Sequence, residues 1–193
     1  MSTLTAITKE EYFEMLHKSD IKLEYHSGEV VAMAGAQPAH NIIVMNMALE
    51  LGLYLKRSNC TMLSSDQLIK VEGCEKYTFP DLVIVCEEPI YERNPFRGLD
   101  ALLNPNIIIE VLSDSTEFYD RTEKLECYKT IPSFTEYVLV ASKKKKVEVY
   151  KKIMEDEWLL HEYRRDNEKV KIGDCEILFE DVYNKVSFET IGV

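Results

Sequence analysis

Two strongly apolar segments, each carrying one carboxylate, constrain the fold of this chain most. Residues 79–85 read Phe-Pro-Asp-Leu-Val-Ile-Val and contain Asp81, and residues 106–112 read Asn-Ile-Ile-Ile-Glu-Val-Leu and contain Glu110. Runs of this kind are typical of strands that are buried on both faces. A buried, ionised carboxylate is costly unless it is paired or bound to a metal ion. The two acids on successive strands therefore predict a site for Mg²⁺, which binds carboxylates together with water and phosphate oxygens.

The spacing of apolar residues predicts a single mixed α/β domain over residues 1–193, with a central sheet flanked by helices. Strands are expected at 21–25, 29–33, 60–63, 67–71, 78–86, 106–112, 136–141, 147–150, 157–163, 170–172 and 175–179. Helices are expected at 8–17, 38–57 and from 115 or 116 to 130. The order strand, helix, strand at 106–141 predicts a crossover unit, and the later strands predict an antiparallel β extension.

Two segments of the chain support further structural predictions. The helix at 38–57 has Pro38 in its first turn, where a missing amide is harmless, and its apolar residues predict that it is buried. Residues 87–104 hold prolines and show no sustained periodicity. They predict a surface loop that could cover the site.

Length and composition narrow the class of protein. With 193 residues, of which 46% are hydrophobic, the chain suffices for one sizeable core. No apolar run is long enough to cross a bilayer, and the first residues lack the features of a signal peptide, so a cytoplasmic protein is expected. The 5 cysteines are odd in number and lack the paired spacing of a zinc site, so reduced thiols without disulfides are expected.

The net charge of -11 is the main feature that argues against nucleic-acid binding. Such affinity rests on Lys and Arg side chains that displace counterions from phosphates. Local basic groups still act within a Debye length of about 8 Å at physiological salt. The densest basic tract comprises Lys143, Lys144, Lys145 and Lys146, with Lys151 and Lys152 nearby. The tract is compatible with a DNA-backbone contact or with a solvated turn that protects a sheet edge.

Further motifs surround the two acids. They are Pro80-Asp81, Glu110 with residues 111–116, residues 120–124, residues 131–137, and residues 23–30 with 38–40 near the amino terminus. Together they resemble the Uma-type family of restriction-endonuclease-like proteins, formerly a domain of unknown function, within the PD-(D/E)xK nuclease superfamily. The resemblance spans nearly the whole chain. It implies a restriction-endonuclease-like core, a Mg²⁺-dependent endonuclease that hydrolyses phosphodiester bonds in DNA, and a homodimer.

The resemblance also implies the residues of a metal site. Asp81, Glu110 and the backbone carbonyl of Val111 would hold Mg²⁺, or Mn²⁺ in its place. Glu24 would complete the metal side as a further acid. In a strand of period two only one of Glu24 and Glu29 can face the site, although the turn between them can reset the register. The resemblance favours Glu24.

The catalytic lysine departs from the superfamily pattern. Its usual position, two residues after the second acid, is occupied by Leu112. In the Uma-type family the lysine lies on the following helix, where Lys124 matches the place and Lys129 is the rival. Lys124 would stabilise charge that develops on the scissile phosphate. Its alternative role is an ion pair with Asp120, four residues earlier on the same helical face.

The other site residues have structural alternatives too. A Pro-Asp pair is common in turns, so Asp81 could simply open a strand at the surface. Glu110 could form an ion pair with Arg121 or Lys124 without any metal. His40, near the start of the second helix, is expected to close the helix end rather than to contact a metal or phosphate. A degenerate metal site would make the chain a nuclease-fold module for binding or regulation, which its acidic charge and Leu112 favour.

Overall fold

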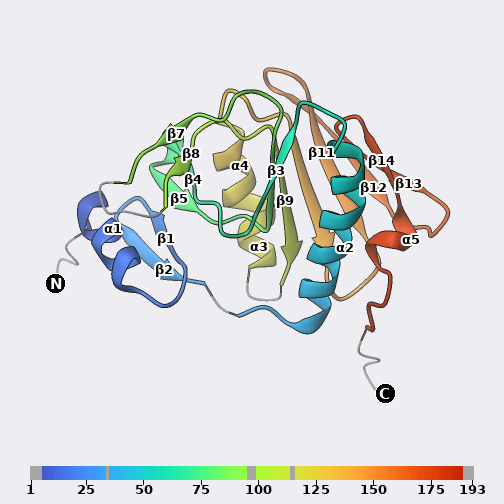
Figure 1. Ribbon diagram of the computed structural model, residues 1–193, viewed down its shortest axis with the longest axis horizontal. Coiled ribbons are helices and arrows are strands. Elements are labelled where there is room, and N and C mark those ends of the chain that lie inside the picture. The colour runs from blue at the N-terminus through green and yellow to red at the C-terminus, as the bar shows by residue number, and fades with distance from the viewer. Residues whose placement is uncertain (1–5, 34, 95–98, 114–115, 189–193) are drawn as a thin grey trace.

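The structure, a computed structural model, describes residues 6–33, 35–94, 99–113 and 116–188. Within these ranges the strands form two six-stranded sheets and a two-stranded hairpin (Figure 1). The main sheet has the order β12-β11-β10-β9-β6-β3, with β3 at Thr61–Ser64, β6 at Leu82–Val85, β9 at Ile107–Leu112, β10 at Glu136–Ala141, β11 at Val147–Met154 and β12 at Glu157–Tyr163. The second sheet has the order β2-β1-β5-β4-β8-β7, with β1 at Leu23–His26, β2 at Glu29–Ala32, β4 at Ile69–Val71, β5 at Lys76–Thr78, β7 at Tyr91–Glu92 and β8 at Ala101–Leu102. The predicted mixed α/β architecture is confirmed.

Helical segments cover both faces of the main sheet. One face packs against α2 (Pro38–Leu55), α5 (Phe179–Val182) and the hairpin of β13 (Lys169–Ile172) and β14 (Cys175–Leu178). The other face packs against a segment that runs from α3 (Glu117–Tyr119) through the π-helical turn η2 (Asp120–Lys124) to α4 (Leu125–Tyr128). Figure 1 shows α2 and α4 on opposite sides of β9. The helix α1 (Lys9–Lys18), which begins with a capping box formed by Thr8 and Glu11, packs against the second sheet.

The side chains of β9 alternate between these two layers. Ile107, Ile109 and Val111 pack on the α2 side, whereas Ile108 and Leu112 pack on the α4 side. Glu110 shares the α4 side because residues two apart on a strand share a face. The strand is therefore apolar on both faces, and it carries its one carboxylate into the layer that contains Lys124.

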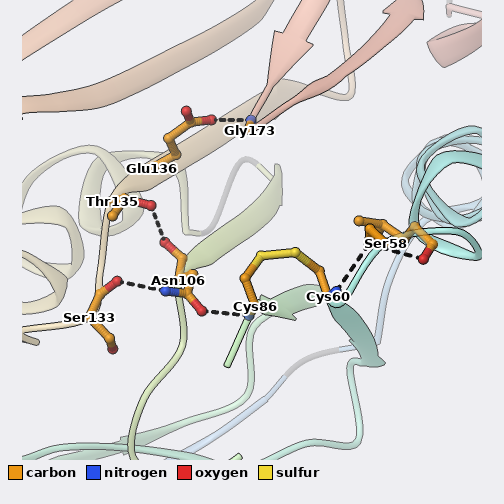
Figure 2. The surroundings of a disulfide bond; sticks show 9 residues. Ser58, Cys60, Cys86, Asn106, Ser133, Thr135, Glu136 and Gly173 are labelled. Atoms are coloured by element: carbon orange, nitrogen blue, oxygen red, sulfur yellow. Dashed lines mark hydrogen bonds between the residues drawn. A yellow bond between two sulfur atoms is a disulfide. The ribbon is translucent and has the colours of Figure 1, made fainter. Parts of the chain in front are cut away.

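The expected crossover connects β9 to β10 in parallel, with Ile107 opposite Glu136 and Glu110 opposite Leu139. Asn106 fixes the start of β9. Its side-chain carbonyl accepts the Cys86 amide at 2.6 Å, and its side-chain amide donates to the Ser133 carbonyl at 3.1 Å (Figure 2). These contacts hold the ends of three neighbouring strands together and so set the register in which the site residues meet.

The strand expected at 78–86 is wrong as a single element. The chain leaves the second sheet at the end of β5 and enters the main sheet at the start of β6. Pro80 has no amide hydrogen and cannot donate to a strand ladder, so the switch between sheets falls at Phe79-Pro80-Asp81. Asp81 consequently lies at the entrance of β6 rather than inside a buried strand.

The expectation that the helix at 38–57 is buried holds for one face only. Ile43, Met47 and Leu51 of α2 are fully buried against the main sheet. A second apolar row turns away from the sheet and is largely exposed: Met45 at 67%, Leu49 at 61% and Leu53 at 62%. The apolar residues of α2 surround the helix, but only one side of it contacts the sheet.

Three other expectations change in detail. The loop expected at 87–104 contains the short strands β7 and β8, and its residues 95–98 lie outside the described residues. The helix expected from 115 or 116 begins at Glu117, and Ser115 lies outside the described residues. The last two strands form their own hairpin rather than continuing the antiparallel extension of β11 and β12. In the part of the chain that the structure describes, no helix has the length and apolar character to span a membrane.

Two disulfides contradict the expectation of reduced cysteines. Cys60 is bonded to Cys86 (Figure 2) and Cys74 to Cys127, which leaves Cys175 as a free, buried thiol. The first bridge follows from the antiparallel pairing of β3 and β6, in which the next pair of residues after Thr61 and Val85 is Cys60 and Cys86. Cysteine spacing along the chain does not reveal this pairing because it depends on the register of two strands.

We expect one reactive thiol per chain when the protein is denatured without reductant, and five after reduction, because two bridges use four of the 5 cysteines. A thiol titration in denaturant, with and without prior reduction, measures both numbers. Five reactive thiols before reduction would contradict both bridges.

Candidate active site

The two predicted acids lie side by side where β6 begins and β9 nears its end. The amide of Asp81 donates to Glu110 Oε2 at 3.4 Å, and the amide of Val111 donates to Asp81 Oδ2 at 2.7 Å. The Glu110 side chain is 7% exposed and that of Asp81 is 15% exposed. The antiparallel register of β6 and β9, in which Leu82 stands opposite Ile109, brings the two carboxylates together.

The backbone of Val111 presents its polar groups to the same place. In a strand, the amide and the carbonyl of one residue point toward the same neighbouring strand. Since the Val111 amide reaches Asp81, the Val111 carbonyl lies on the same edge of β9. Asp81, Glu110 and this carbonyl therefore form a set of oxygen donors of the kind that Mg²⁺ prefers.

Lys124 reaches this cluster from the π-helical turn η2. Its Nζ lies 2.7 Å from Glu110 Oε1, 3.4 Å from Asp120 Oδ1 and 3.9 Å from Glu24 Oε1, and the side chain is only 6% exposed. Single π-helical turns inside α-helices are frequent at functional sites. The ion pair with Asp120, considered as the alternative role of Lys124, is present, and it leaves Nζ in contact with Glu110 as well.

Tyr128 is a site residue that the sequence reasoning missed. Its hydroxyl donates to Glu110 Oε1 at 3.2 Å and lies 3.1 Å from Thr78 Oγ1. The available indication was its position four residues after Lys124, which places both on one helical face. Burial raises the pKa of Tyr128 well above its usual range, and the nearby carboxylates act in the same direction. The group therefore stays a hydrogen-bond donor toward Glu110.

Glu24, on β1, joins the cluster from the second sheet. Its Oε1 accepts the Phe79 amide at 2.8 Å, and its Oε2 lies 3.3 Å from His26 Nε2. Burial favours the protonated form, but the charge of Lys124 and these two hydrogen bonds outweigh it, so the pKa of Glu24 lies below its usual value. Glu29 is exposed on β2 and lies outside the cluster.

His40 contradicts the expectation that it only closes a helix end. From the first turn of α2, its Nε2 lies 3.2 Å from Asp81 Oδ2. Burial alone would lower the pKa of His40. The hydrogen bond to Asp81 and the negative charge of Asp81 outweigh burial, so the pKa of His40 lies above its usual value. Its Nδ1 is buried and has no hydrogen-bond partner among the described residues. The start of α2 lies over the entrance of β6, which sequence spacing alone does not show.

Negative charge exceeds positive charge in the cluster. Glu110 is fully buried, and burial together with Asp120 and Asp81 holds its pKa well above the usual value although Lys124 lowers it. Conversely, the pKa of Lys124 lies well above its usual value because the surrounding carboxylates outweigh the effect of burial. A divalent cation next to Asp81 and Glu110 would balance this excess, so the donor set fits the expected metal.

These oxygen donors fit a metal ion that keeps some of its bound water molecules. Within the described residues, no group of three or more His, Cys, Asp or Glu side chains is arranged to hold a metal ion. Two carboxylates and one carbonyl would leave the remaining coordination positions of a bound ion to water and other oxygen ligands. This distribution of ligands is typical of Mg²⁺.

Lys129 and Arg121, the other basic residues considered for the site, form ion pairs with other carboxylates. Lys129 Nζ lies 2.6 Å from Glu126 Oε1 and stacks over the Trp158 ring. Arg121 pairs with Glu117 and Glu148 rather than with Glu110.

The lysine tract lies in the turn between β10 and β11. Lys145 pairs with Asp166, and Lys146 is buried between Glu148 and Glu162. These ion pairs favour the structural interpretation of the tract over a DNA contact.

Comparisons with known proteins identify the family of this chain. A family profile named Uma2, described as "Putative restriction endonuclease", matches residues 9–176. The chain is 30% identical over 177 residues to the uncharacterized protein sll1609 of Synechocystis sp. (strain ATCC 27184 / PCC 6803 / Kazusa), which covers 92% of this chain and 98% of that protein. A second uncharacterized protein of the same strain, slr1290, is 27% identical over 183 residues and 94% of each chain.

One solved structure shares the fold. It is described as a putative nuclease belonging to DUF820 from Anabaena variabilis ATCC 29413, and it superposes with a TM-score of 0.68 at 16% sequence identity. The match covers 89% of this chain and 97% of that one. At this level of identity the comparison bears on the fold alone, and it supports the nuclease-like architecture.

Proposed function

This chain belongs to the Uma2 family of restriction-endonuclease-like proteins, and from that membership we propose that it hydrolyses phosphodiester bonds in DNA with the help of a divalent cation. The observation that carries the proposal is that Asp81 and Lys124 both contact Glu110, although Leu112 occupies the usual place of the lysine. Geometry, rather than sequence order, defines a catalytic constellation.

Asp81, Glu110 and the Val111 carbonyl would hold Mg²⁺ or Mn²⁺. The support is the excess of carboxylates in a buried cluster. Burial, Asp120 and Asp81 raise the pKa of Glu110, and a bound cation would favour its ionised form. Such a cation supplies positive charge to the phosphate oxygens and makes a nearby water more acidic. His40 positions Asp81, whose other contact is the Val111 amide.

Lys124 would bind a non-bridging oxygen of the reacting phosphate and stabilise the charge that grows on it. Preorganised cations of this kind contribute a large share of catalysis in phosphoryl transfer. Glu110, Asp120 and Glu24 hold the ammonium group in place before substrate arrives. Glu24 therefore has a positioning role toward Lys124 in addition to its charge on the metal side.

Cleavage of both strands of a duplex requires two sites that face opposite strands. A two-fold homodimer is the simplest assembly that supplies them. We include this dimer in the proposal.

We expect the purified chain to nick supercoiled plasmid DNA in Mg²⁺ or Mn²⁺ and to be inactive in EDTA, because two carboxylates and a carbonyl cannot replace the cation's charge at the phosphate. Gel electrophoresis of the plasmid over time measures the rate, and a parallel assay with RNA distinguishes the two nucleic acids. Metal binding without cleavage of either substrate would favour a degenerate module for binding or regulation. Equal cleavage in EDTA and in Mg²⁺ would contradict the metal dependence.

A further inference from the structure

A chain of hydrogen bonds leads from the acid cluster to a second lysine. Glu24 Oε2 lies 3.3 Å from His26 Nε2, which in turn lies 3.2 Å from the hydroxyl of Tyr119. Lys76 Nζ donates to the same hydroxyl at 3.1 Å and lies 4.8 Å from the centroid of the Tyr119 ring. Lys76 also stands opposite His26 in the pairing of β1 with β5. The ammonium group of Lys76 is therefore fixed beside the proposed site.

The charge of Lys76 is weakly compensated. Its ion pair among the described residues is with Glu123, at 3.9 Å, and the Glu123 side chain is 72% exposed. Exposed pairs of this kind contribute little in water. Burial lowers the pKa of Lys76 below its usual value; Lys124 acts in the same direction, and Glu123 and Glu24 only partly oppose it.

Lys70, on β4 of the same sheet, provides a contrast. Its side chain is 11% exposed, against 12% for Lys76. Its Nζ lies 2.5 Å from Glu92 and 3.6 Å from Glu72. Burial alone would lower the pKa of Lys70, but these two carboxylates raise it above its usual value. The protein itself neutralises Lys70, whereas Lys76 keeps positive charge that an external anion can use.

We propose that Lys76 binds a backbone phosphate of the nucleic acid next to the scissile one, and that this phosphate displaces Glu123. The inference rests on the nuclease function proposed above and extends its site. Lys124 is enclosed by Glu110, Asp120 and Glu24 and stays with the reacting phosphate. Lys76 lies at the outer end of the hydrogen-bond chain. There it provides a second positively charged side chain, beside Lys124, with which a strongly acidic protein can bind the substrate.

The test measures the affinity of a fluorescently labelled DNA duplex in EDTA, over a series of salt concentrations, by anisotropy. We expect Lys76→Gln to weaken binding by roughly tenfold at low salt and to reduce the slope of log affinity against log salt by about one. Lys76→Arg keeps the charge and should restore most of the affinity. Glu123→Gln removes the competing carboxylate and should strengthen binding.

Lys70→Gln is the matched control, since it removes an equally covered lysine whose charge the protein already neutralises, and it should leave the salt slope unchanged. A purely structural role for Lys76 predicts an unchanged salt slope in Lys76→Gln. That result, in a chain that cleaves DNA, would overturn this inference alone. A wild-type chain that neither binds nor cleaves nucleic acid would overturn the proposed function and this inference with it.

Discussion

Replacing Asp81 by Asn should lower the rate of metal-dependent DNA cleavage by roughly a thousandfold, because the several kcal/mol of charge stabilisation from the cation are lost with its ligand. Asn keeps an oxygen that can accept the Val111 amide, as Asp81 does at 2.7 Å. The substitution also removes one of the carboxylates that destabilise ionised Glu110. The variant loses the charge that His40 contacts and gains from the weaker repulsion at Glu110, so it should remain folded in EDTA.

Plasmid nicking in Mg²⁺ measures the loss of rate, and thermal unfolding in EDTA checks the fold. Asp66→Asn is the matched control, since Asp66 is 82% exposed and pairs with Lys22 away from the cluster. It should cleave at the wild-type rate. An Asp81→Asn protein that is folded and cleaves at the wild-type rate would remove Asp81 from the mechanism.

Replacing Lys124 by Met should have two large effects. Cleavage should fall by about a hundredfold or more, as expected for loss of a preorganised group that stabilises transition-state charge. The free energy of unfolding at neutral pH should fall by about 3–5 kcal/mol, because removing one member of a buried ion pair leaves uncompensated charge on Glu110 and Asp120. Lys129→Met, on the next helical turn, removes a lysine that pairs with Glu126 and should have little effect on either quantity.

The loss of stability in Lys124→Met should depend on pH in a defined direction. Burial already raises the pKa of Glu110 and Asp120, and the positive charge of Lys124 is the largest effect that opposes it in both. Without the lysine, both folded-state pKa values rise further above those of the unfolded chain. Such groups destabilise the fold as pH rises through the folded pKa. The difference in unfolding free energy between wild type and variant should thus shrink as the pH is lowered.

Chemical denaturation of both proteins over a range of acidic to neutral pH measures this difference. A difference that stays constant with pH would show that Lys124 stabilises the protein by packing alone.

The sequence predicted the part of the site that depends on local pattern. Glu110 is recognisable as one carboxylate in an apolar run, and the following helix and β10 are evident from periodicity. The choice of Lys124 on that helix came from the family resemblance, and the structure places its Nζ 2.7 Å from Glu110 Oε1. A residue such as Tyr128 could have been added from its position on the same helical face.

The remaining contacts depend on tertiary register and could not be read from spacing. The meeting of Asp81 and Glu110 was expected, but the position of Asp81 at the entrance of β6 follows from the change of sheets at Pro80. His40 reaches Asp81 because α2 starts above that point. The Cys60–Cys86 bridge depends on the pairing of β3 with β6. Each of these contacts joins segments that no local rule connects.

The ion pairs show where part of the net charge of -11 is located. Three carboxylates surround the buried Lys124, those of Glu24, Glu110 and Asp120, and Asp81 adjoins Glu110. Part of the acidity is therefore concentrated at the point where a cation is expected, rather than spread over a surface that would repel DNA. Lys76, at the edge of the same cluster, keeps a charge that its neighbours only partly balance.

Isothermal titration of the wild-type chain with Mn²⁺ tests the central claim most directly, because it requires no knowledge of the substrate. If Asp81, Glu110 and the Val111 carbonyl form a metal site, the wild type should bind Mn²⁺ with a saturable heat, and Asp81→Asn should lose it while Asp66→Asn keeps it. Saturable binding that is equal in all three proteins, or no binding in any of them, would contradict the claim.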